Sequence, residues 1–119
     1  MDPLKPEGQV ELSRNLQVTT AAVDSMGMCV FIAFAVLDQP ETFQAMIDIA
    51  NGFAGANLTA EDVAELGKSV LKKEREFNIQ AGMSNKDDRL PDYFQNEPLA
   101  PHNVTFQVTD EELDEVHNY

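Results

Sequence analysis

Apolar residues recur at helical spacing through the first two thirds of the chain. Separations of three and four residues place side chains on one face of an α-helix. The pattern predicts three amphipathic helices, whose apolar stripes are Leu12, Leu16, Thr19 and Val23, then Phe43, Met46, Ile47 and Ala50, then Val63, Leu66, Val70, Leu71 and Phe77. We therefore expect an all-α protein.

The residues between these stripes indicate where each helix begins and ends. The first is expected from Gln9 to Met26, because Gly27 can take the left-handed conformation that ends a helix. Pro40 suits the first turn of the second helix, and Asn51-Gly52 is expected to end it. The sequence Thr59–Asp62 is a typical helix cap, and Gly82 is a suitable end for the helix that it opens.

Between the first two helices lies the uncharged run from Met28 to Leu37. It has no polar face, so we expect it to be buried on all sides, either within this domain or against a missing one. At ten residues it is about half as long as a bilayer span. In either case the isolated chain should expose an apolar surface around Val30 to Leu37, where its neighbour belongs, and that surface would favour self-association.

The remainder of the chain predicts little regular structure. Prolines at three positions rule out a long helix between residues 83 and 101. Val104 to Val108 could form a short extended stretch, and Thr109–Glu112 is a second capping box that opens a final helix through Val116. We therefore expect an irregular multihelical bundle of about four or five helices: residues 1–8 as an irregular lead-in, 9–82 as the helical core, and 83–119 as a long proline-containing surface segment with the last helix.

The charge balance narrows the classes of partner. The chain has 8 basic and 21 acidic residues, which gives a formal net charge of -13. Nucleic acids and anionic membranes are poor partners, because both require a basic face. No secretory signal is present at the start of the sequence, and a single cysteine excludes an internal disulfide framework. These features favour a soluble, cytoplasmic protein.

Familiar catalytic and metal-binding motifs are missing from the sequence. There is no glycine-rich nucleotide motif and no zinc-ligand spacing, since His102 and His117 are far from the single cysteine. Both histidines are expected at the surface. Glu74, beside the third apolar stripe, is the carboxylate expected to be partly buried, and an ion pair with an arginine is its favoured role.

Cys29 is the one residue whose setting suggests chemistry, and two interpretations stand side by side. Beside an apolar run, it can be a small buried hydrophobe. Alternatively, Gly27 lets the backbone approach a bulky group, and the thiol, shielded from water at the mouth of the run, could ligate a metal cluster.

A resemblance favours the second interpretation. Asp24-Ser-Met-Gly-Met-Cys29 resembles the second D-x-x-G-L-C type motif of the tungsten-pterin aldehyde:ferredoxin oxidoreductases. Further segments are similar to that family's C-terminal region and follow in the same order: Asn57–Asp62, Glu74–Asn78, Asp87–Pro91, and the ending with Glu97–Leu99 and Glu111–Asp114. The resemblance covers nearly the whole chain, with Met28 standing where leucine is usual.

The resemblance implies a role for three residues in a longer enzyme. Cys29 would be the fourth cysteine ligand of a [4Fe–4S] cluster, whose other three ligands come from an earlier domain. Asp24 would hydrogen-bond one of the two pterins that hold tungsten or molybdenum, and the backbone at Met28 and Cys29 would approach the same pterin. The implied reaction is the oxidation of aldehydes to carboxylic acids, with electrons leaving through the cluster to ferredoxin or a similar acceptor.

The implied partners of this chain are the N-terminal domains of the same polypeptide. One thiolate cannot hold a cubane that needs four, so we expect the isolated chain to bind neither cluster nor pterin and to be inactive. The competing hypothesis is a small acidic helical interaction module without a redox role, in which Cys29 belongs to the core.

Overall fold

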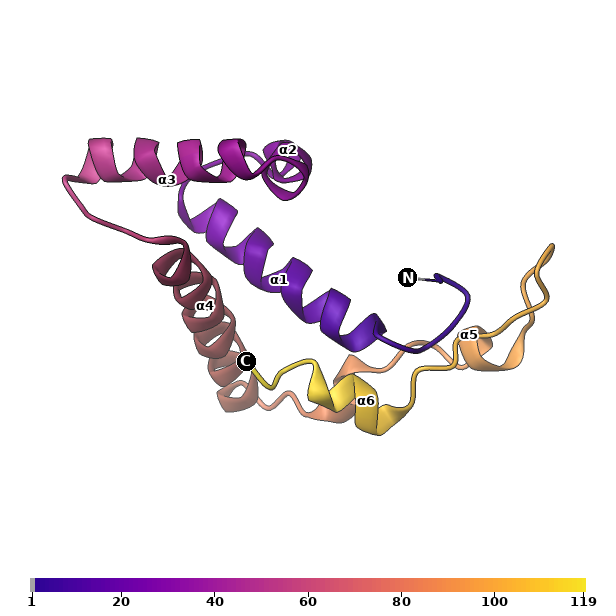
Figure 1. The fold of residues 1–119 in the computed structure, drawn as a ribbon. Helices are drawn as coiled ribbons and strands as arrows, with labels where there is room; N and C mark the ends of the chain where they lie inside the picture. The colour runs from indigo at the N-terminus through magenta and orange to yellow at the C-terminus, as the bar shows by residue number, and fades with distance from the viewer. Residues whose placement is uncertain (1) are drawn as a thin grey trace. The chain divides into compact units, whose positions relative to one another are not determined.

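The computed structural model describes residues 2–119, and their regular structure consists of helices joined by loops (Figure 1). The elements in chain order are α1 (Gln9–Ser25), the 3-10 helix η1 (Val30–Ile32), α2 (Ala33–Asp38), α3 (Pro40–Ala54), α4 (Ala60–Gln80), the 3-10 helix η2 (Asn85–Asp88), α5 (Tyr93–Asn96) and α6 (Asp110–Glu115). Over residues 2–119 the only β-type pairing is an isolated bridge between Leu99 and Val104. The all-α prediction is confirmed.

The chain divides into two compact units. One is Asn15–Arg75, and the other joins residues 2–14 to Glu76–Tyr119. Within residues 2–119, no helix has both the length and the apolar character needed to cross a bilayer.

The core of the unit Asn15–Arg75 is built by four helices. Its buried side chains come from α1, α2, α3 and α4: Ala22, Val23, Val36, Met46, Ile47 and Val63. Three of these, Val23, Met46 and Ile47, are almost completely inaccessible to solvent. They are positions that the helical periodicity assigns to the apolar stripes, so the stripes predict the centre of this core correctly.

The outer parts of the stripes lie outside that core. Leu12 and Leu16 in α1 are about two-fifths exposed, at 41% and 42%, and Phe77 in α4 is exposed at 72%. Membership of an apolar stripe therefore does not by itself mean burial in this chain. Helical periodicity thus marks an apolar face without fixing how much of that face is buried.

The uncharged run after α1 is also only half buried. It forms η1 and α2, in which Ala33 and Val36 face the core while Phe31 and Phe34 are exposed. Burial on all sides within this domain is therefore wrong, and the predicted exposed apolar surface around residues 30–37 is confirmed. In Figure 1, α2 is seen nearly end-on, next to the beginning of α3.

The second predicted helix ends later than expected. α3 begins at Pro40 as predicted, but it continues through Asn51 and Gly52 to Ala54, and Gly55 takes the left-handed conformation with φ of 64°. The Asn51 side chain is instead a clamp for the following loop: its Nδ2 donates to the Leu58 carbonyl at 3.0 Å and its Oδ1 accepts from the Leu58 N–H at 2.7 Å. Asn51 thus fixes the loop that leads into α4.

Both predicted capping boxes are confirmed. At the start of α4, the Thr59 N–H donates to Asp62 Oδ2 at 2.8 Å, and the Asp62 N–H donates to Thr59 Oγ1 at 3.3 Å. The Thr59 hydroxyl, which donates to Asp62 Oδ2 at 2.7 Å, lowers the pKa of Asp62, and the Thr59 N–H lowers it further. At the start of α6, Thr109 and Glu112 make the same reciprocal pair, which satisfies backbone donors that the helix leaves free.

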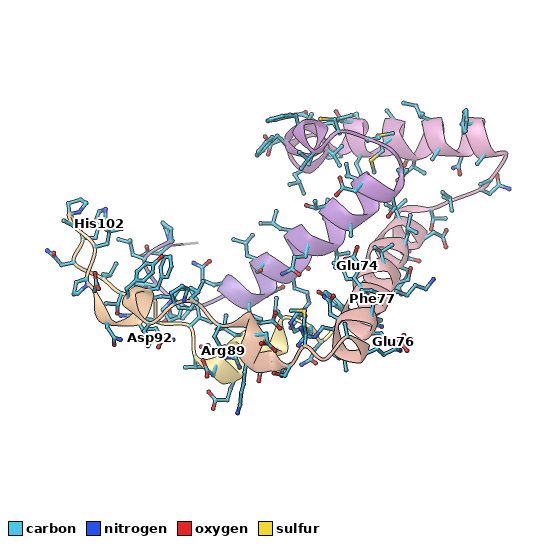
Figure 2. All side chains as sticks on the ribbon, turned by 180° about the vertical axis from the view of Figure 1, so that it is seen from behind. Glu74, Glu76, Phe77, Arg89, Asp92 and His102 are labelled. Carbon is cyan, nitrogen blue, oxygen red and sulfur yellow. The ribbon has the colours of Figure 1, made fainter. Side chains whose placement is uncertain are left out.

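In the other unit, two arginines hold α6. The Arg14 side chain donates to the carbonyl oxygens of Glu115 and Val116, at the end of the helix. Arg89 Nε lies 3.1 Å from Asp110 Oδ1, and Arg89 Nη2 lies 2.7 Å from Asp114 Oδ1. Figure 2 labels Arg89 beside this short helix. A six-residue helix is too short to be stable alone, so these contacts maintain it.

Candidate cofactor site

The motif Asp24–Cys29 forms a sharp backbone turn where α1 ends. The Gly27 N–H donates to the Asp24 carbonyl at 3.0 Å, and the Met28 N–H donates to the Val23 carbonyl at 3.2 Å. This pair of hydrogen bonds is the Schellman motif, which needs a left-handed residue after the helix. Gly27 supplies it with φ of 73°, as the sequence predicted.

Met28 anchors this turn through its side chain. It is partly buried and packs against the core cluster that contains Val23. A hydrophobic contact of this kind commonly accompanies the Schellman motif. The side chain of Met28 is thus turned mainly to the core.

Asp24 lies in the last turn of α1 with its side chain exposed. Its carboxylate makes no hydrogen bond or ion pair with any other residue of the described part of the chain. A negative charge is unfavourable at a helix C-terminus, where the dipole is negative too, by about 0.3–1 kcal/mol. Stability of the helix therefore gives no reason for an aspartate here.

Cys29 follows the turn in an extended conformation, with φ of -70° and ψ of 138°. Its carbonyl accepts the Ile32 N–H at 3.0 Å, which begins η1, and its side chain is exposed. Both sequence interpretations expected a thiol hidden from water, one as a core residue and one at a sheltered mouth, and both are wrong on this point. The apolar residues after Cys29 do not fold over it.

Space is open beside the turn. A Cβ atom built on Gly27 would meet no other atom within 4 Å. The glycine is thus required by its backbone conformation and not by crowding from this chain. Three features lie within six residues: the Asp24 carboxylate without a partner among the described residues, the Gly27 backbone without a side chain, and the exposed Cys29 thiol.

The chain does not gather a complete metal site by itself. Among residues 2–119, no three His, Cys, Asp or Glu side chains form a group that could hold a metal ion. His102 is exposed in the loop between Leu99 and Val104, as Figure 2 shows. His117 Nε2 lies 3.5 Å from Asp88 Oδ2 in the other unit. Any cluster at Cys29 therefore needs ligands from outside the described residues.

Glu74 takes no part in a buried site. Its side chain is exposed on α4 (Figure 2), so its predicted partial burial is wrong. The predicted apolar stripe ends in Phe77, which is itself exposed, and the environment that would have buried the carboxylate is absent.

Comparison with known proteins identifies the family. The family model for aldehyde ferredoxin oxidoreductase, domains 2 and 3, matches residues 1–119. The chain belongs to the aldehyde ferredoxin oxidoreductase family. The resemblance to this family is thereby confirmed.

Individual relatives agree with this assignment. The chain is 32% identical over 101 residues to a tungsten-containing aldehyde ferredoxin oxidoreductase of Pyrococcus furiosus, an alignment covering 83% of this chain and 16% of that protein. Proteins of the same description from Pyrococcus horikoshii and Thermococcus kodakarensis are 31% and 30% identical, with the same coverage. The chain thus spans about one sixth of the length of these relatives. No solved structure matches it.

The structure also shows a cluster that sequence reasoning missed. Arg89 belongs to the family-like segment Asp87–Pro91, and its guanidinium lowers the pKa of Asp114. Asp110 and Asp114 follow it by 21 and 25 residues, a separation that carries no sequence signal for an ion pair. This cluster organises the C-terminal unit and lies apart in sequence from the Cys29 motif.

Proposed function

We propose that this chain contributes the Cys29 ligand and a pterin contact to a tungsten (or molybdenum) bis-pterin aldehyde:ferredoxin oxidoreductase. Family membership supports the class of enzyme. The observation that carries the proposal is the exposed Cys29 thiol placed directly after the Gly27 turn, beside a carboxylate with no partner among the described residues. An interaction module with Cys29 in its core is not favoured, because the thiol is exposed.

The residues at the end of α1 fit the implied cofactors. The Cys29 thiolate would be one ligand of a [4Fe–4S] cluster, with the other ligands from elsewhere in the polypeptide. The Asp24 carboxylate would accept hydrogen bonds from the amino-pyrimidine of one pterin. Open space at Gly27 permits the close approach that such a group needs.

The bound groups would supply the oxidation of an aldehyde and water to a carboxylic acid, two protons and two electrons, and the passage of those electrons to ferredoxin or a similar acceptor. The residues of this chain would bind these groups and orient them. The Schellman turn fixes the backbone conformation between Asp24 and Cys29. The Met28 side chain packs this turn against the core. Cysteine thiols stay reduced in a reducing compartment, so the proposal implies a cytoplasmic location.

The direct test is replacement of Cys29 in the full-length polypeptide. Cys29→Ala should remove most of the cluster iron and the spectroscopic signal of the cluster. Met28→Leu, which changes the neighbouring residue to one of similar volume, should retain both. Equal iron content in Cys29→Ala and the parent protein would contradict the ligand role.

A second test uses this chain alone. Because it holds one thiol and no group of three metal ligands among its described residues, we expect purified chain to bind iron and tungsten far below one equivalent. Stoichiometric metal in the isolated chain would refute the view that the site needs the rest of the enzyme.

A further inference from the structure

The surface immediately after Cys29 is apolar and exposed. Phe31 and Phe34 are 79% and 70% exposed, and Val30 and Leu37 are about half exposed. We call these four residues the α2 apolar face. They belong to η1 and α2, whose other side, at Ala33 and Val36, packs into the core.

This surface is unusual in a strongly charged chain. Charged residues make up 24% of the sequence, yet none occurs between Met26 and Leu37. Two largely exposed phenylalanines within four residues are disfavoured on a monomer surface and indicate a covered interface. Since the segment carries no charge, the occupant must present an apolar, uncharged surface.

The position of Cys29 points to the occupant. If Cys29 bonds to a cluster, the part of the polypeptide holding the other cluster ligands must reach the thiol, and Val30 and Phe31 are the next two residues. The chain spans about 16% of its relatives' length, so a large part of such an enzyme is available to cover this face. A cluster ligand also needs shielding from water, which this chain does not give to Cys29 by itself.

We infer that the α2 apolar face is the docking surface for the cluster-bearing part of the same polypeptide, and that Phe31 and Phe34 shield the Cys29–cluster bond from solvent. This inference rests on the proposed function. It adds a named interface and a protective role for two residues that bind no cofactor.

Phe53 provides a matched control. It is the same residue type, 96% exposed, near the end of α3. Phe53 is 13 residues beyond Pro40, where α3 begins, which is about 20 Å of helix. Its exposed fraction is larger than that of Phe31, and it lies 24 residues beyond Cys29 in the sequence.

The experiment is carbene labelling of the full-length enzyme, read by mass spectrometry. Phe31 and Phe34 should be labelled several-fold less than Phe53, although all three are at least 70% exposed in this chain. Equal labelling of the three residues would overturn the inference. Labelling of Phe31 and Phe34 that rises on dilution would also overturn it, because the occupant would then be a second copy.

Variants test the protective role. Phe31→Ser combined with Phe34→Ser should speed loss of the cluster to an iron chelator several-fold, while Phe53→Ser leaves the rate unchanged. Equal rates in the double variant and the control would overturn the shielding role. All three residues are exposed in this chain, so its folding should survive, which thermal melting checks.

The two proposals fail in different ways. If Cys29→Ala keeps its iron while Phe31 and Phe34 are still protected from labelling, the ligand assignment is wrong and the interface stands. If Cys29→Ala loses its iron while both phenylalanines are labelled like Phe53, the ligand assignment stands and the inferred interface is wrong.

Discussion

The backbone of α4 at Gly67 lies against the backbone of α1 at Val18. A Cβ atom on Gly67 would overlap the Val18 carbonyl oxygen, and it would lie 3.0 Å from the carbonyl carbon and 3.2 Å from the Val18 Cγ1. Gly67 is buried, so this contact permits the two helices to approach closely at the core. A glycine in a helix interior is otherwise unfavourable, by roughly 0.5–1 kcal/mol relative to alanine.

Gly67→Ala should therefore destabilise the unit Asn15–Arg75. The clash is with backbone, which cannot rotate away, and overpacking of this kind costs about 1–3 kcal/mol. Denaturant unfolding followed by circular dichroism measures the change. Gly52→Ala is the control, because a Cβ atom added to Gly52 in α3 would meet no other atom within 4 Å, and it should gain roughly 0.5–1 kcal/mol. A stabilising Gly67→Ala would show that the two helices lie further apart in solution.

Asp24→Asn should leave the fold intact or stabilise it slightly. The change removes a negative charge from the C-terminal turn of α1, worth about 0.3–1 kcal/mol, and breaks no contact with the described residues. In the full-length enzyme, the same change should lower pterin and tungsten content if the carboxylate binds the pterin. Asp48→Asn, at another exposed acid, should leave both contents unchanged. A markedly lower melting temperature of Asp24→Asn would indicate a structural role.

Gly27→Ala should be harmful at the turn. A residue with a Cβ in the left-handed conformation costs roughly 1–2 kcal/mol, although the space around Gly27 is open. Asparagine tolerates this conformation better, so Gly27→Asn should lie between alanine and the parent in melting temperature. If alanine and asparagine were equally well tolerated, the left-handed turn would not be maintained in solution.

The contact between Arg89 and Asp114 should make the attachment of α6 sensitive to acid. The Arg89 guanidinium lowers the pKa of Asp114 from its ordinary 3.8. Since the folded pKa is the lower one, the contact stabilises fully above pH 3.8 and is lost as the pH falls through the folded value. The protection factors of the amides in Asp110–Glu115, measured relative to intrinsic exchange at each pH, should therefore fall in that range.

Arg89→Met should remove this pH dependence and speed exchange in α6 at neutral pH as well. Lys86→Met is the matched control, because Lys86 is a nearby exposed cation in η2 that does not contact α6 through any described hydrogen bond or ion pair. The same exchange rates in both variants would show that Arg89 does not hold the helix.

The sequence by itself determined the helical character and most helix boundaries. Local hydrogen bonding explains this success: the caps at Thr59 and Thr109, Pro40 in the first turn of α3 and the left-handed Gly27 all act within a few residues. The one clear boundary error, at Asn51-Gly52, arose because the Asn51 side chain binds Leu58 across the loop instead of ending the helix.

Only the tertiary structure decided which apolar residues are buried. Periodicity identifies a face of a helix but not how far a neighbour extends along it, so Val23 is buried while Leu12 and Phe77 are exposed. For the same reason the sequence identified Asp24 and Cys29 as candidate site residues but did not predict their exposure. That exposure depends on how η1 and α2 pack. The motif determined the candidate ligand, and the packing of α2 left both the thiol and the adjoining phenylalanines open.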